Sequence, residues 1–130
     1  MSRSRKILVI DDSEVVLEAT KAALSAGGFE VITRDTPFGS GAAILREQPD
    51  LVLVDFDMPC LSGEDVVRHV REHPAIERTC IVFFSDRNQD ELRAVAGRTG
   101  ADGWITKTDA MGGALAARVS ALLEQRRRNP

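Results

Sequence analysis

Five polar residues stand directly after short apolar runs of the sequence. Asp11 and Asp12 follow KILVI, Asp55 follows LVLV, Ser85 follows CIVFF and Lys107 follows GWIT. Open parallel sheets bind ligands beyond the carboxyl ends of their strands, so runs that form one such sheet would bring these side chains together. Three carboxylates at one edge repel one another unless they are solvated apart or a cation neutralises them. We expect a hard cation at this edge.

The residue types at these positions favour magnesium and phosphoryl transfer. Mg²⁺ prefers oxygen ligands and typically takes one or two carboxylates with waters and a phosphate oxygen. The histidines and cysteines that zinc needs are absent from these strand ends. Lys107 offers a point charge and Ser85 a hydroxyl for the oxygens of a phosphoryl group. Asp55 is the natural nucleophile, because a carboxylate attacks phosphorus to give an acyl phosphate.

The elements that must position these residues alternate along the chain. Apolar runs are typical of strands at 6–10, 30–33, 51–54, 80–84 and 103–106. The first, third and fourth are continuously apolar, as in strands that helices cover on both faces of a parallel sheet. The pattern predicts one (βα)5 domain with a doubly wound open sheet, since a barrel needs eight such units.

Helical periodicity fills the segments between the runs. The first helix has a small-to-apolar stripe, and Gly27 and Gly28 end it. The stripe consists of Val16, Ala19, Thr20, Ala23 and Leu24. Further helices are predicted at about 37–47, 63–73, 90–99 and 111–127. The Asp11–Asp12 pair stands where a helix N-cap is favoured, but capping accounts for only one of the two acids.

Composition narrows the class of protein. The chain has 130 residues and a net charge of −3, which argues against a nucleic-acid surface. We expect a single domain over 1–130 with a core at about 5–125, and a solvated basic tail at 126–130 that contains Arg126 to Arg128. The apolar stretch near the start is too short for a signal peptide or membrane span. Cys60 and Cys80 show no disulfide or metal spacing, which favours a cytoplasmic location.

Four segments together resemble a known family. KILVIDDSE, LVLVDFDMPCLSGED, IVFFSD and ADGWITK are similar to signature segments of bacterial two-component response-regulator receiver domains, of the stand-alone chemotaxis type, over nearly the whole chain. The resemblance implies a flavodoxin-like sheet of order 2-1-3-4-5. It also implies a phosphorylation-dependent switch and not a classical enzyme, with at most self-catalysed phosphoryl transfer and autodephosphorylation.

The resemblance implies a role for each site residue. Asp55 accepts a phosphoryl group from the phosphohistidine of a sensor histidine kinase or phosphotransfer protein. Asp11, Asp12 and Asp55 hold Mg²⁺, for which Mn²⁺ can substitute, together with the backbone carbonyl of Asp57. Asp12 is the more direct of the paired ligands. Ser85 and Lys107 bind the phosphoryl group. Trp104 matches the aromatic switch position that moves as Ser85 is drawn toward the phosphate, although a buried edge aromatic is an equally ordinary reading.

Two positions depart from the family pattern, and two others bear on the lifetime of the phosphoryl group. Thr108 follows Lys107 where the family has proline after a cis peptide bond. The sequence therefore does not determine how far Lys107 extends toward the site. Asp86 adds bulk and negative charge beside Ser85 where a small residue is usual. Asp57 and Arg87 occupy positions that tune the lifetime of the phosphoryl group in this family. We expect Asp57 and Arg87 to pair across the mouth of the site and hinder an attacking water.

Two other functions compete with the switch. A degenerate receiver that binds partners without phosphorylation draws support from Thr108 and Asp86. A haloacid-dehalogenase-type phosphatase shares the DxD opening at Asp55 and Asp57, but there the acid pair comes late in the chain. For a stand-alone receiver, output passes to a partner protein at the face of the fourth helix, fifth strand and fifth helix. No direct DNA binding is expected, and the chain is a monomer or a phosphorylation-linked homodimer.

Overall fold

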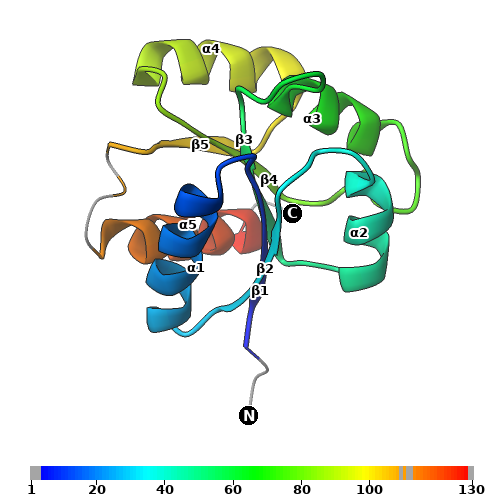
Figure 1. Cartoon of the computed structure of the whole chain (residues 1–130). Coiled ribbons are helices and arrows are strands. Elements are labelled where there is room, and N and C mark those ends of the chain that lie inside the picture. The colour runs from blue at the N-terminus through cyan, green and yellow to red at the C-terminus, as the bar shows by residue number, and fades with distance from the viewer. Residues whose placement is uncertain (1–3, 109, 111–112, 129–130) are drawn as a thin grey trace.

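Five parallel strands and five helices alternate along the chain in the computed structural model (Figure 1). The structure describes residues 4–108, 110 and 113–128. The strands are β1 (Lys6–Ile10), β2 (Glu30–Arg34), β3 (Leu51–Asp55), β4 (Ile81–Ser85) and β5 (Gly103–Thr106). The helices are α1 (Glu14–Ala26), α2 (Ser40–Glu47), α3 (Gly63–Arg71), α4 (Gln89–Thr99) and α5 (Ala114–Arg128). Within the described residues no helix is long and apolar enough to cross a bilayer.

The sheet has the expected order β2-β1-β3-β4-β5, and all four pairings are parallel. The three continuously apolar runs are the central strands β1, β3 and β4, whose residues are almost all buried. The strands at the two edges, β2 and β5, are shorter or less buried. This agrees with the rule that strands covered on both faces lose the alternation of apolar and polar residues.

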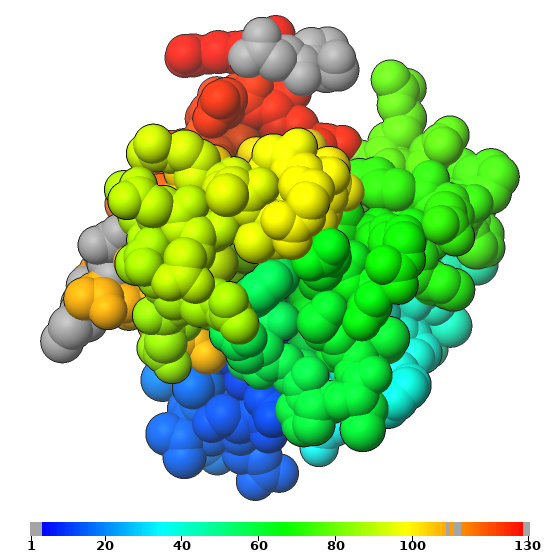
Figure 2. Space-filling model, turned by 90° about the horizontal axis from the view of Figure 1, so that it is seen from above, coloured from blue at the N-terminus to red at the C-terminus, as the bar shows by residue number. Residues whose placement is uncertain are grey.

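Successive residues of each strand contribute to different halves of the core, because side chains alternate across a sheet. Leu8, Val54 and Phe83 pack in the half that α2, α3 and α4 cover. Val9, Leu53 and Phe84 pack in the half that α1 and α5 cover. Figure 1 shows α1 and α5 together on one side of the sheet, and Figure 2 shows α4 beside α3 on the other. The same alternation continues to the strand ends and determines on which face of the sheet each site residue lies.

One sequence prediction about a helix face is wrong. Ala19, predicted on the buried stripe of α1, is exposed, whereas Leu17 is buried with Thr20 and Leu24. The large side chain of Leu17 packs against the sheet where small residues are predicted. The buried face of α1 is therefore rotated by about one residue from the predicted face. The predicted start of the last helix at residue 111 lies outside the described residues.

Arg126 also departs from its predicted place in a solvated tail. It lies in the last turn of α5, where its guanidinium pairs with Asp102 at 2.5 Å and donates to the carbonyl of Arg78. Asp102 begins the turn into β5 and accepts a second ion pair from Arg71 at 2.8 Å. These contacts tie the end of α5 to the amino ends of β4 and β5, so Arg126 belongs to the packed fold. Residues 129 and 130 of the expected tail lie outside the described residues.

Gly63 at the start of α3 allows the chain to pass close behind Asp55. A Cβ at this position would lie 2.7 Å from the carbonyl oxygen of Asp55 and 2.9 Å from the Cα of Phe56. The Gly63 amide also donates to the Phe56 carbonyl at 3.0 Å. Because both clashes are with backbone, no side-chain rotation relieves them.

We predict that Gly63→Ala lowers the free energy of unfolding by about 2 kcal/mol or more, because the backbone must shift to admit the methyl group. Gly97→Ala is the matched control. Gly97 lies in α4 with open space where a Cβ would stand, so alanine there should stabilise the chain by about 0.5–1 kcal/mol. Urea unfolding of both variants checks this, and equal effects would contradict the close-approach argument.

Candidate phosphoryl-transfer site

Three carboxylates meet at the carboxyl end of the central strands. One oxygen atom from each of Asp11, Asp12 and Asp55 lies within 4.8 Å of the others. Asp11 directly follows β1 and is 1% exposed, and Asp55 ends β3 and is 7% exposed, whereas Asp12 is exposed. Buried carboxylates this close repel one another strongly. The site therefore needs positive charge.

Lys107 supplies a positive charge from the end of β5. Its Nζ lies 3.0 Å from Oδ2 of Asp11 and 3.8 Å from Oδ2 of Asp55. Its backbone amide donates to the Ser85 carbonyl at 2.8 Å, which continues the β4–β5 pairing by one residue. The Lys107–Thr108 peptide bond is trans. Lys107 thus reaches both buried carboxylates although the next residue is threonine and not proline.

The pKa values reflect this crowding. Burial raises the pKa of Asp55 to about 6, against the lowering effect of the Lys107 charge and with a further increase from Asp11. Burial also lowers the pKa of Lys107. The hydrogen bond to Asp11 and the charges of Asp55 and Asp11 outweigh this effect and hold the Lys107 pKa above its ordinary value. The Asp55 carboxylate is thus costly to ionise where it stands.

The acid pair does not cap α1. Ser13 is the N-cap, and its hydroxyl accepts from the Val16 amide at 3.3 Å. Asp11 instead accepts from the Ser13 amide at 2.9 Å on Oδ1 while its Oδ2 faces Lys107. This leaves Asp12 on the exposed side of the cluster. The local geometry of the turn therefore directs both acids toward the end of the sheet.

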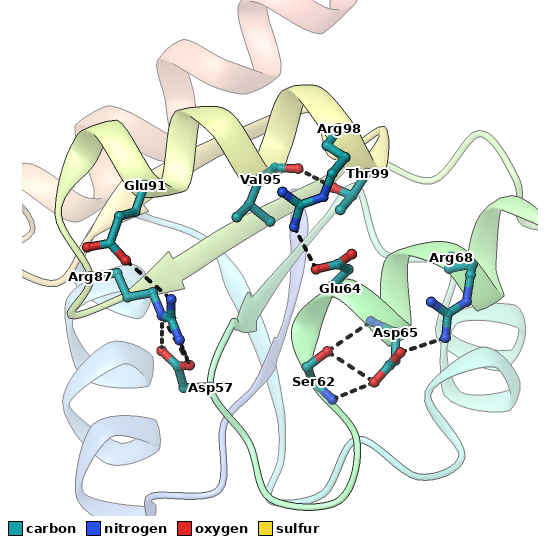
Figure 3. A network of polar contacts seen from close by, with 10 residues as sticks. All are labelled: Asp57, Ser62, Glu64, Asp65, Arg68, Arg87, Glu91, Val95, Arg98 and Thr99. Carbon is teal, nitrogen blue, oxygen red and sulfur yellow. Dashed lines mark hydrogen bonds and ion pairs between the residues drawn. The ribbon is translucent and has the colours of Figure 1, made fainter.

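Asp57 and Arg87 form an ion pair beside the cluster (Figure 3). Arg87 Nη2 lies 2.8 Å from Asp57 Oδ1 and Arg87 Nε lies 2.9 Å from Oδ2. The hydrogen bond from Arg87 lowers the pKa of Asp57 below its ordinary value. Arg87 also pairs with Glu91 in the first turn of α4 at 3.2 Å, and its guanidinium lies 4.8 Å from the ring centre of Phe56.

Ser85 and Trp104 lie on the other face of the sheet from Asp55. The Ser85 hydroxyl is buried, donates to Asp57 Oδ2 at 3.4 Å and accepts from the Arg87 amide at 3.2 Å. Trp104 is partly buried, and the guanidinium of Arg93 lies 5.8 Å from its ring centre. Its indole nitrogen is buried without a hydrogen-bond partner among the described residues. Asp86, predicted to crowd the entrance, is exposed.

The donor set fits a hard divalent cation. Three carboxylates carry three negative charges and Lys107 carries one positive charge, which leaves two negative charges for a cation to neutralise. All the side-chain donors are oxygen atoms, which Mg²⁺ prefers. Neither free cysteine belongs to the cluster. The residues present therefore match the cation that the sequence predicts.

Sequence reasoning missed two neighbours of the site. Glu91 stands four residues after Arg87, the spacing of a helical ion pair, and this signal could have found it. Phe56 lies between two acidic residues and gives no polar signal, so its contact with the Arg87 guanidinium emerges only from the fold. The structure brings Asp11, Asp12, Asp55 and Lys107 together as expected, and it adds the Arg87 network next to them.

Comparisons with known proteins identify the family. The profile of the response regulator receiver domain family matches residues 7–118. The phosphate regulon transcriptional regulatory protein PhoB of Rhizobium meliloti (strain 1021) is 35% identical over 123 residues, which are 92% of this chain and 52% of that protein. The transcriptional regulatory protein KdpE of Mycobacterium tuberculosis is 33% identical over 101 residues, 78% of this chain and 43% of that protein. The chain thus spans about half the length of these curated relatives.

Solved structures share the fold. The chemotaxis protein CheY4 of Vibrio cholerae matches with a TM-score of 0.82 at 23% identity, over 92% of this chain and 99% of that one. A response regulator receiver domain protein of Clostridium thermocellum matches with a TM-score of 0.80 at 22% identity, over 97% and 99%. Receiver domains are signalling domains that interact with histidine kinases or phosphotransfer proteins. This chain belongs to the response regulator receiver domain family of two-component systems.

Proposed function

We propose that the chain is a phosphorylation-dependent signalling switch whose phosphoacceptor is Asp55. The observation that carries this proposal is the position of Asp55, buried at the end of β3 with Lys107 Nζ 3.8 Å from its Oδ2. The phosphoryl donor is a phosphohistidine of a sensor histidine kinase or phosphotransfer protein. Phosphoryl transfer depends mainly on positioning and charge neutralisation. A carboxylate beside an ammonium group and a cation site therefore has what it needs to accept a phosphoryl group.

In the transfer, an oxygen of Asp55 forms a bond to phosphorus as the bond from phosphorus to the histidine nitrogen breaks. The imidazole keeps the electron pair of that bond, and Asp55 becomes an acyl phosphate. Lys107 holds a phosphoryl oxygen, and the Ser85 hydroxyl turns from Asp57 to donate to another. Mg²⁺, or Mn²⁺ in its place, would be held by Asp11, Asp12, Asp55 and the Asp57 carbonyl, and would neutralise the phosphoryl charge. Asp12 would be the more direct ligand of the acid pair.

The output of the switch would pass through Trp104. Strand alternation places Ser85 and Trp104 on the same face of the sheet, under α4. Movement of the Ser85 hydroxyl toward the phosphoryl group frees space on this face, and the buried indole N–H gains if the ring turns to an acceptor. We propose that a downstream protein docks on the face of α4, β5 and α5, without direct DNA contact by this domain. A cytoplasmic monomer or a phosphorylation-linked homodimer fits this role.

The reach of Lys107 weighs against a degenerate receiver. Thr108 and Asp86 support that reading, yet Lys107 contacts both buried carboxylates although its peptide bond to Thr108 is trans. The phosphatase alternative requires an acid pair late in the chain, whereas the pair here follows β1. We therefore propose a switch without classical enzymatic turnover, capable of self-catalysed phosphoryl transfer and autodephosphorylation.

Phosphorylation is directly testable. With Mg²⁺ and a small phosphoryl donor, the chain should gain one phosphoryl group by mass spectrometry, and Asp55→Asn should gain none. Lys107→Ala should slow the gain by about tenfold to a hundredfold, since a charge contact to the transferred group is lost. Absence of an adduct on a chain that binds Mg²⁺ would favour the degenerate receiver. Hydrolysis of a generic phosphate ester would favour the phosphatase.

The Asp57–Arg87 pair should protect the phosphoryl group from water. We predict that Arg87→Ala and Asp57→Ala shorten the lifetime of phosphorylated Asp55 by about threefold to tenfold, which corresponds to roughly 1 kcal/mol. The decay of the adduct mass measures this lifetime. Arg98→Ala is a matched control, because it removes an ion pair from α4 to Glu64 away from the phosphoacceptor. Unchanged lifetimes in both site variants would reject the protective role.

The raised pKa of Asp55 predicts how stability varies with pH. The carboxyl has an ordinary pKa of 3.8 and a pKa of about 6 in the fold, so the folded chain binds the proton more tightly and loses stability as pH rises through this window. At pH 7 without divalent cations, Asp55→Asn should therefore be more stable than the parent, by at most about 3 kcal/mol.

Urea unfolding at pH 3.5 and pH 7 measures this difference. The two chains should have nearly equal stability at the lower pH, where Asp55 is protonated in the folded state and mostly protonated in the unfolded state. Mg²⁺ at pH 7 should narrow the difference, because it binds the folded parent. A difference that is the same at both pH values would show that the Asp55 charge is not its cause.

A further inference from the structure

The Asp57 carboxylate lies next to the cation site without joining it. Asp57 follows Asp55 by two residues and its amide donates to Asp55 Oδ1 at 3.1 Å. Among the described residues, however, the carboxylates that come within reach of a common ion are those of Asp11, Asp12 and Asp55. The Asp57 side chain instead faces the β4–α4 loop, where Arg87 binds both of its oxygens.

Arg87 is held in this position from three sides. Asp57 takes Nε and Nη2, Glu91 accepts from Nη1 at 3.2 Å, and the Phe56 ring lies under the guanidinium at 4.8 Å. The side chains of Arg87 and Asp57 are 43% and 51% exposed. An exposed pair of this kind is worth little free energy, so its loss would leave the fold intact and the Asp57 carboxylate free to turn.

A fourth carboxylate would change which cation the site prefers. Mg²⁺ is bound through one or two carboxylates and keeps several waters, whereas Ca²⁺ takes six to eight oxygen ligands in flexible geometry. Cation choice between the two therefore depends on ligand number. With Asp57 neutralised by Arg87, the cluster and Lys107 carry two net negative charges; with Asp57 released, they carry three.

We propose that Arg87 is a specificity-determining residue for the cation, because it withholds the Asp57 carboxylate from the site formed by Asp11, Asp12 and Asp55. This inference rests on the proposed function, which requires a divalent cation there. Arg87 is a positioning residue in this scheme, since it acts on the cation through Asp57. Its contacts with Phe56 and Glu91 keep it aligned with Asp57 whether or not a cation is bound.

Calorimetric titration of the metal-stripped chain with Mg²⁺ and with Ca²⁺ tests the proposal. Arg87→Met keeps an apolar stem over Phe56 and removes the charge. It should lower the Kd for Ca²⁺ by on the order of tenfold and that for Mg²⁺ much less, because only Ca²⁺ readily accepts the added ligand. The double variant Arg87→Met/Asp57→Asn should return the ratio of the two Kd values to that of the parent.

Arg98→Met is the matched control, since it removes an ion pair from α4 to Glu64 that involves neither Arg87 nor Asp57, and it should leave the ratio unchanged. Circular dichroism confirms that each variant folds. A parental ratio in Arg87→Met, or an altered ratio that persists in the double variant, would overturn the inference while Mg²⁺ binding by the parent still supports the proposed function. Failure of the parent to bind either cation would reject the proposed cation site, and the inference with it.

Discussion

The repulsion between two buried carboxylates, Asp11 and Asp55, constrains the whole carboxyl end of the sheet. They stand at the ends of adjacent central strands and are almost wholly removed from water. Among the described residues, the ammonium group of Lys107 is the one within ion-pair distance of both. One positive charge does not neutralise three acids, and the pKa of Asp55 is raised to about 6, chiefly by burial and further by the charge of Asp11. The fold therefore keeps a site with an excess of negative charge, which a divalent cation or an added proton would neutralise. A site with unneutralised buried acids is sensitive to any group that adds or removes charge beside it.

The pleat of the sheet divides this site into two functions. Continued alternation places Asp11, Asp55 and Lys107 toward the half of the core under α1 and α5, whereas Ser85 and Trp104 lie toward α4. The charged groups that would hold the phosphoryl group are thus gathered on one face. The hydroxyl and the aromatic ring that would respond to it are on the other face. Side-chain period alone produces this division, without any special loop.

The sequence predicts the strands and their ends well, because burial on both faces leaves an unmistakable apolar run and each run stops at a polar residue. The cluster of Asp11, Asp12, Asp55 and Lys107 follows from those ends. The face of α1 is harder to predict, since alanines are compatible with either side and only packing selects Leu17. The bond from Arg126 to Asp102 joins residues 24 positions apart through the fold, and no local pattern indicates it. Local chemistry is predictable here where it depends on strand ends, and not where it depends on helix packing.

Two arginine–aspartate pairs show how differently the same chemistry is used. Arg71 is mostly buried and donates to Asp102 and to the carbonyls of Gly100, Glu77 and Thr79, so its loss would leave several backbone acceptors without partners. Such a pair holds the fold together. The Arg87–Asp57 pair is about half exposed, and within the part of the chain that the structure describes Arg87 donates to no backbone carbonyl, so the pair stabilises the fold little. We propose that its effect is instead on the charge and the ligands beside Asp55, where a small change in free energy would alter cation choice and the access of water.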